Sequence, residues 1–171
     1  AAIAQYRIVA DRLREARDLV PKIETTWAER RAFRSPEAAA VIFKRVKTET
    51  DGSAADVKDL FKRPRPFLRD ASLEPCLGRI GGLSYPSGHA TISRLFALML
   101  ADLVPSRKKE FFARADEAAL DRVIGGVHHP SDIEAGKKLA DKLYKLYRRS
   151  PAFKADMAAL RALLVKEGAA K

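Results

Sequence analysis

The feature that most constrains this fold is a stretch of large apolar residues at helical spacing between positions 90 and 103. These side chains recur every three to four positions, at Ile92, Leu95, Phe96, Leu98, Met99 and Leu103. That period places them on one broad face of a helix, and such a face must be buried against other elements. We therefore predict a helix over residues 90–103 at the centre of the core.

Other segments show the same period, and none shows the sustained alternation that a half-buried strand requires. We predict helices over residues 2–20, 36–47, 54–61, 90–103, 105–124, 133–149 and 151–166. Ser35 and Ser150, each followed by proline, are typical N-caps, and Ser131 or Asp132 can cap the helix that follows. The expected fold is an all-α bundle of six or seven helices, with the active site built from loops and helix ends.

Glycines and prolines predict where these helices are interrupted. Asp51-Gly52-Ser53 is read as a turn, and the prolines of residues 62–66 should stop the helix before them. Residues 68–88 are rich in glycine and lack helical periodicity, so we expect a long loop there. Long loops in compact domains commonly carry function.

The size of the chain is that of one domain, which we place at residues 1–171 with the motif-bearing part at 58–132. No apolar stretch approaches the length of a membrane span, and the first residues lack the features of a signal peptide. With 33 Lys and Arg against 22 Asp and Glu, the net charge of +11 favours anionic partners. Much of the surplus lies beyond residue 133, on a helix that is either a solvated face or a contact for a membrane surface.

Two segments pair cations or histidine with predicted helix ends. Lys58 and Arg65 flank a helix end and a proline-stiffened loop, which could aim both cations inward. In Pro86-Ser87-Gly88-His89, Gly88 permits a close approach of the backbone, and free N–H groups at a helix start can bind an anion.

The third segment, residues 121–132, combines Arg122 with two histidines and Asp132. Between them, Gly125-Gly126 lets the backbone turn tightly and bring Arg122 and His128 toward one point. An arginine beside a histidine that an aspartate supports suits an anionic substrate attacked by imidazole.

In order, the three segments read K-x-x-x-x-x-x-R-P, P-S-G-H and R-x-x-x-x-x-H-x-x-x-D. Together they resemble the type 2 phosphatidic acid phosphatase superfamily, and residues 83–89 are most similar to the soluble bacterial class A non-specific acid phosphatases. This resemblance implies a metal-independent phosphatase of the bacterial periplasm, with no cofactor and a phosphohistidine intermediate. It also implies the site residues: nucleophile His128, its orienting Asp132, the acid and base His89, and the phosphate-binding groups Lys58, Arg65, Ser87, Gly88 and Arg122.

Several neighbouring residues have no assigned role in this pattern. Asp121 stands where the family commonly has serine, and it either accepts a hydrogen bond from a nearby cation or faces solvent. His129 is interpreted as a packing residue, and Lys62 and Arg63 as solvated charges that could also contact a second phosphate.

Other functions remain open from the sequence. The substrate could be a small phosphomonoester, or a lipid phosphate or polyprenyl pyrophosphate at a membrane surface. A vanadate-dependent haloperoxidase and a non-catalytic polyanion-binding module are the remaining alternatives. We expect no nucleic-acid partner, and the terminal amphipathic helices could support a homo-oligomer.

Overall fold

A computed structural model describes residues 33–164, and between its loops this part of the chain is helical. The longer helices are α2 (Pro36–Phe61), α4 (Gly88–Leu103), α5 (Lys108–Ile124), α6 (Pro130–Tyr147) and α7 (Pro151–Leu163). A one-turn helix α3 (Pro66–Arg69) and a 3-10 turn η1 (Pro105–Arg107) complete the described elements. The all-α prediction is confirmed, while the helix predicted over residues 2–20 lies outside the described residues.

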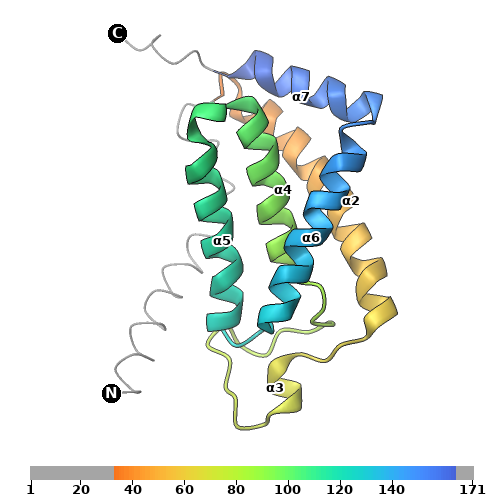
Figure 1. Cartoon of the computed structure of the whole chain (residues 1–171), viewed down its shortest axis with the longest axis vertical. Helices are drawn as coiled ribbons and strands as arrows, with labels where there is room; N and C mark the ends of the chain where they lie inside the picture. The colour runs from red at the N-terminus through yellow and green to blue at the C-terminus, as the bar shows by residue number, and fades with distance from the viewer. Residues whose placement is uncertain (1–32, 165–171) are drawn as a thin grey trace.

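The helix α4 occupies the middle of the bundle (Figure 1). It packs between α5 and α6, α2 lies behind it, and α7 crosses the end where α4 finishes. Leu95 and Met99 of α4 are completely buried and contact the same core as Val46 of α2 and Leu160 of α7. Burying a side chain of this size contributes about 1.5–3 kcal/mol to stability. The apolar stretch at residues 90–103 thus forms the central core helix, as predicted.

The predicted turn at residues 51–53 is wrong, because α2 continues through it to Phe61. Val46, Thr50 and Ala54 are all buried at a spacing of four, so one helix face stays in the core on both sides of Gly52. Thr50 Oγ1 also donates to the Val46 carbonyl at 2.7 Å. This burial outweighs the cost of about 1 kcal/mol for a glycine within a helix.

The start of α6 also differs from its prediction. The N-cap is His129 and Pro130 is the first helical residue. Asp132 therefore lies within the first turn, where its carboxylate accepts the His129 N–H at 2.8 Å. The helix ends at Tyr147 instead of Arg149, and Leu146 is 57% exposed. Leu143 and Tyr144 are the residues that α6 buries near this end.

Other boundaries agree with the sequence. Ser35 and Ser150 cap α2 and α7 by accepting the N–H groups of Ala38 and Phe153. The segment from Pro105 begins with η1 before continuing as α5, and Phe111, Ala115 and Ala119 form the buried face of that helix. Within residues 33–164, no helix has the length and apolar character needed to cross a bilayer.

Four helix ends meet at one end of the bundle, beside α3 and the long loop before α4 (Figure 1). There α2 and α5 finish, and α4 and α6 begin. Each sequence motif lies at one or two of these ends.

Candidate active site

Hydrogen bonds connect the three motif segments. Lys58 Nζ donates to the carbonyl oxygens of Leu83 and Pro86, both at 2.7 Å. The Ser87 N–H donates to the Asp132 carbonyl at 3.0 Å, which ties the start of α4 to the first turn of α6. The structure therefore brings the predicted site residues of all three segments to one place.

Arg65 is buried at the start of α3 and joins the first motif to the third. Its Nη1 donates to the Val127 carbonyl at 2.8 Å and lies 3.3 Å from His128 Nε2. Its Nε and Nη2 donate to the carbonyl oxygens of Gly81 and Gly82 at 3.0–3.1 Å. A guanidinium with so many fixed bonds has one orientation, and that orientation places positive charge against His128.

The ring of His128 is held at both nitrogens. Nδ1 lies 3.4 Å from Asp132 Oδ2 and 3.5 Å from Ser84 Oγ, while Nε2 faces Arg65. Because arginine can only donate, Nε2 must accept, which assigns the ring proton to Nδ1 on the Asp132 side. Burial, assisted by the charges of Arg65 and Lys58, lowers the pKa of His128 although Asp132 opposes the shift. The imidazole is thus favoured in its neutral form with an unprotonated Nε2.

The Asp132 carboxylate is completely buried and fully engaged by donors. Oδ2 accepts from Ser84 Oγ at 2.5 Å and from the His129 N–H at 2.8 Å. Oδ1 accepts from Arg63 Nη1 at 2.8 Å. Burial alone would raise the pKa of Asp132, but these bonds, the contact with His128 and the charge of Arg63 hold it well below its ordinary value. Asp132 therefore stays ionised.

His89 and Arg122 come from opposite helix ends. His89 lies in the first turn of α4 and is exposed to solvent. Crowding by the surrounding protein and the charge of Arg122 nevertheless lower its pKa to about 4. Arg122 lies in the last turn of α5, and its buried Nε has no hydrogen-bond partner among the described residues. Buried donors are normally paired, so this Nε is available to an anion.

Asp121 is half-buried beside Arg122. Burial and the charge of Arg65 lower the pKa of Arg122, and the negative charge of Asp121 partly opposes this. The charge of Asp121 thus acts on Arg122, while a hydrogen bond from Asp121 to a cation stays a prediction.

The predicted glycine turn is present between α5 and α6. Gly126 has a φ of +73°, a conformation that few residues other than glycine adopt. The N–H groups of Val127 and His128 both donate to the Arg122 carbonyl at 3.2 Å. This tight turn connects Arg122 directly to the backbone of His128, as expected.

The start of α4 departs in one detail from its prediction. The Ser87 N–H, expected to bind phosphate, is occupied by the Asp132 carbonyl, and Ser87 Oγ instead caps the helix by accepting the Ala90 N–H. The first helical bond of α4 runs from the Thr91 N–H to the Ser87 carbonyl. The N–H groups of Gly88 and His89 precede that bond and are the ones suited to an anion.

Two residues of this site were missed from the sequence. Arg63, interpreted there as a solvated charge, forms an ion pair with buried Asp132, so that interpretation is wrong. Ser84 is completely buried against Asp132 and His128. A buried serine within a proline-containing loop gives no signal in the sequence beyond its closeness to the second motif. By contrast, Lys62 is exposed as expected, and His129 is partly buried at the N-cap of α6.

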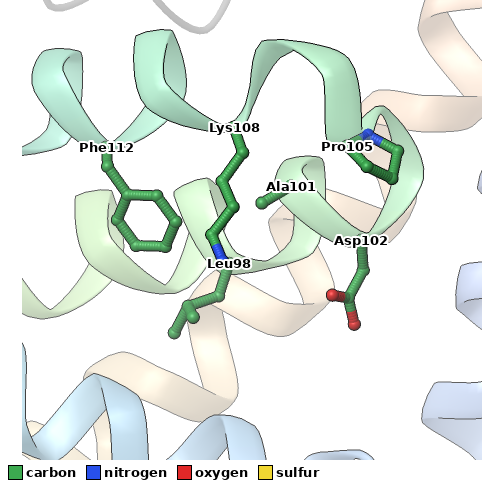
Figure 2. Close-up of a pocket in the computed structure, with 6 residues that line it drawn as sticks. All are labelled: Leu98, Ala101, Asp102, Pro105, Lys108 and Phe112. Atoms are coloured by element: carbon green, nitrogen blue, oxygen red, sulfur yellow. The ribbon is translucent and has the colours of Figure 1, made fainter.

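A separate pocket lies at the other end of the bundle, where α4 passes through η1 into α5 (Figure 2). It is lined by Leu98, Ala101, Asp102, Pro105, Lys108 and Phe112. The Asp102 carboxylate accepts the Tyr144 hydroxyl at 2.6 Å, which gives it a structural partner. No motif residue lines this pocket, so the converging helix ends remain the candidate active site.

Comparison with known proteins relates this chain to a family. The model of the PAP2 superfamily matches residues 38–140. An acid phosphatase of Zymomonas mobilis is 33% identical over 138 residues, which is 77% of this chain and 51% of that protein. A non-specific acid phosphatase of Salmonella typhi is 34% identical over 115 residues, 64% of this chain and 45% of that protein.

A shorter part of the chain is similar to a protein that is named for a lipid. The lipid A 1-phosphatase of Rhizobium etli is 38% identical over 65 residues, 38% of this chain and 28% of that protein. The chain spans about half the length of the acid phosphatases that it matches. The resemblance drawn from the three motifs is confirmed at the level of the family.

Proposed function

This chain belongs to the PAP2 superfamily, and we propose on that basis that it is a phosphatase that hydrolyses phosphate monoesters without a metal ion. The observation that carries the proposal is the convergence of two histidines, a buried aspartate and three cations at one end of the bundle. A neutral imidazole oriented by a carboxylate is a nucleophile, and fixed cations stabilise the charge of a transferring phosphoryl group.

His128 is the nucleophile in this proposal. The lone pair of Nε2 attacks phosphorus, a P–N bond forms, and the P–O bond to the leaving group breaks. Its Nδ1–H points to Asp132 at 3.4 Å, so the positive charge that develops on the ring meets a carboxylate that stays ionised. Water then cleaves the P–N bond and regenerates the free imidazole.

His89 transfers the protons of both steps. Protonated, it donates to the leaving alkoxide, and neutral, it accepts a proton from the attacking water. Crowding and neighbouring positive charge lower the pKa of His89 to about 4. A bound phosphate dianion offsets that positive charge and raises the pKa of His89. Binding of the substrate therefore favours the protonated form of His89, which is the acid.

Lys58, Arg65 and Arg122 bind the phosphoryl oxygens, together with the Gly88 N–H. Arg122 offers its unpartnered Nε, and Lys58 retains one N–H beyond its two carbonyl bonds. Because charge moves onto these oxygens during transfer, cations fixed beforehand lower the barrier.

A lipid phosphate is the second candidate substrate. Leu60, Phe61 and Leu68 are 57–78% exposed in the segments beside the site, and the Rhizobium etli relative is named for a lipid phosphate. Exposed apolar side chains beside cations are suited to an anionic lipid surface. Hydrolysis of a lipid phosphate in vesicles well above the rate for short soluble phosphomonoesters would favour this second candidate.

We also propose a setting for the protein. The resemblance to class A acid phosphatases supports a location in the bacterial periplasm, and we propose that residues 1–171 form one phosphatase domain. We propose a peripheral contact between the basic C-terminal region and a membrane only for the case of a lipid phosphate substrate.

The test is a phosphate-release screen over phosphomonoesters, pyrophosphates and lipid phosphates in the presence of EDTA. We expect turnover of monoesters by the wild-type chain and a loss of at least about 10³-fold in His128→Ala. His129→Ala, the adjacent histidine, is the matched control and should retain turnover. Loss of activity on chelation, or full activity in His128→Ala, would contradict the proposal.

A further inference from the structure

We propose that Arg63 is a positioning residue, whose ion pair with Asp132 limits the attraction of that carboxylate for a proton on His128 and so keeps the nucleophile neutral in acid. The inference rests on the proposed function, since it concerns how the same site works at low pH. No motif position includes Arg63.

The placement of Arg63 is specific. Its Nη1 donates to Asp132 Oδ1 at 2.8 Å and to Ser131 Oγ at 2.6 Å. Its backbone is fixed as well, because its carbonyl oxygen accepts the Ser84 N–H at 2.8 Å. Asp132 is completely buried while the Arg63 side chain is 28% exposed, so Arg63 covers the carboxylate from the solvent side.

The donors to Asp132 are unequal. Ser84 Oγ, the His129 N–H and Arg63 Nη1 lie at 2.5–2.8 Å, whereas His128 Nδ1 lies at 3.4 Å. The contact with the nucleophile is thus the longest of the four. A carboxylate whose charge is neutralised by a cation attracts a proton on a neighbouring imidazole less than an unpaired carboxylate does.

Charged groups face His128 from every element around it. Lys58 on α2 and Arg65 at the start of α3 act on His128 through their charges, and His128 in turn affects His89 on α4. From α5, the backbone carbonyl of Arg122 accepts the His128 N–H. Asp132 on α6 is the anion among them. Since Asp132 is what favours imidazolium here, whatever neutralises Asp132 decides how acidic the solution must become before His128 takes a second proton.

The test compares Arg63→Met, which removes the charge, with Arg63→Lys, which retains it. The pKa of His128 is measured by NMR titration of its imidazole resonances, assigned by their loss in His128→Gln. We expect the pKa to rise by at least about half a pH unit in Arg63→Met and to stay near wild type in Arg63→Lys. Arg63→Gln is a second uncharged variant, should Arg63→Met fold poorly, and thermal unfolding is recorded for each.

The titration needs no turnover, so it separates this inference from the proposed function. If the wild type hydrolyses monoesters, the acid limb of kcat/KM should shift upward in Arg63→Met by the same half unit, about threefold in rate below the limb. A purely structural role would lower the unfolding temperature without moving the titration of His128. An unchanged His128 pKa in the uncharged variants, or an equal rise in Arg63→Lys, would overturn the inference.

Discussion

At the scale of single residues, the site is a cluster of positive charge around one buried carboxylate. Asp132 stays ionised because Ser84, Arg63 and the His129 N–H bind it, and His128 stays neutral beside it. Asp132 is thus the anion of the pair, and His128 is the neutral base. The proposed attack of His128 on phosphorus in acid needs both roles.

If Lys58 binds phosphate as proposed, its titration sets an upper pH limit for that binding. Burial and the charge of Arg65 lower its pKa to about 8, with a smaller opposing effect of Asp132. Lys58 binds the substrate only as the ammonium ion, so kcat/KM should fall about tenfold per unit as the pH rises above about 8. Nitrophenyl phosphate is the substrate for this measurement, since its good leaving group depends little on the acid His89.

The control is Lys58→Arg, whose guanidinium does not titrate in this range. Its alkaline limb should move to higher pH even if its maximal rate is lower. The same limb near pH 8 in both proteins would show that another group causes the loss.

The residues proposed to act directly on phosphate could be identified from the sequence, whereas the residues that support them could not. Lys58, Arg65, His89, Arg122, His128 and Asp132 stand at fixed spacings within three short segments. Arg63 and Ser84 contact Asp132 across 69 and 48 positions of the chain. Their roles depend on how α2, the long loop and α6 meet, which no local pattern contains.

At the scale of elements, close packing of α6 on the start of α4 holds the second motif against the third. A Cβ at Gly136 would lie 2.6 Å from the Ser87 carbonyl oxygen and 3.0 Å from Ala90 Cβ. We predict that Gly136→Ala lowers the free energy of unfolding by about 1–3 kcal/mol through overpacking. Because it displaces the backbone of Ser87, it should also reduce kcat, measured alongside chemical denaturation.

Gly52→Ala is the matched control on α2. A Cβ there would meet nothing within 4 Å, and the position lies within a continuous helix. The substitution should raise stability by about 0.5–1 kcal/mol and leave turnover unchanged. Destabilisation by Gly52→Ala would mean that α2 is interrupted at this point.

The helix ends show where local sequence signals suffice. Ser35 and Ser150 cap their helices as predicted, because a serine before a proline specifies a cap without help from tertiary structure. Asp51-Gly52-Ser53 looked like a turn, but burial of Val46, Thr50 and Ala54 on one face overrides it. At α6, Asp132 was one of two predicted caps. It lies instead inside the first turn, where Ser84 and Arg63 donate to its carboxylate.

At the scale of the whole molecule, the cost of keeping two histidines neutral should appear in stability. Burial and neighbouring cations lower the pKa of His128, and crowding by the surrounding protein with the charge of Arg122 lowers that of the more exposed His89 to about 4, from an ordinary value near 6.5. The unfolded chain therefore binds protons first as the pH falls below about 6.5. The free energy of unfolding should decrease from there down to about pH 4.

Urea denaturation at pH 7.5 and pH 4.5 measures this effect. His89→Gln should lessen the decrease, because glutamine takes up no proton in either state. The bonds to Asp132 add a further loss only below about pH 4, where its unfolded form becomes protonated. Equal stability at the two pH values in the wild type would contradict the assigned neutral histidines.

The central claim is that His128 carries the phosphoryl group, and trapping that intermediate tests it most directly. The chain is mixed with a labelled phosphomonoester in EDTA, quenched in alkali, where phosphohistidine survives, and mapped by mass spectrometry. We predict label on His128 in the wild type and in His129→Ala, and none in His128→Ala. Label on another residue, or undiminished turnover in His128→Ala, would contradict the account.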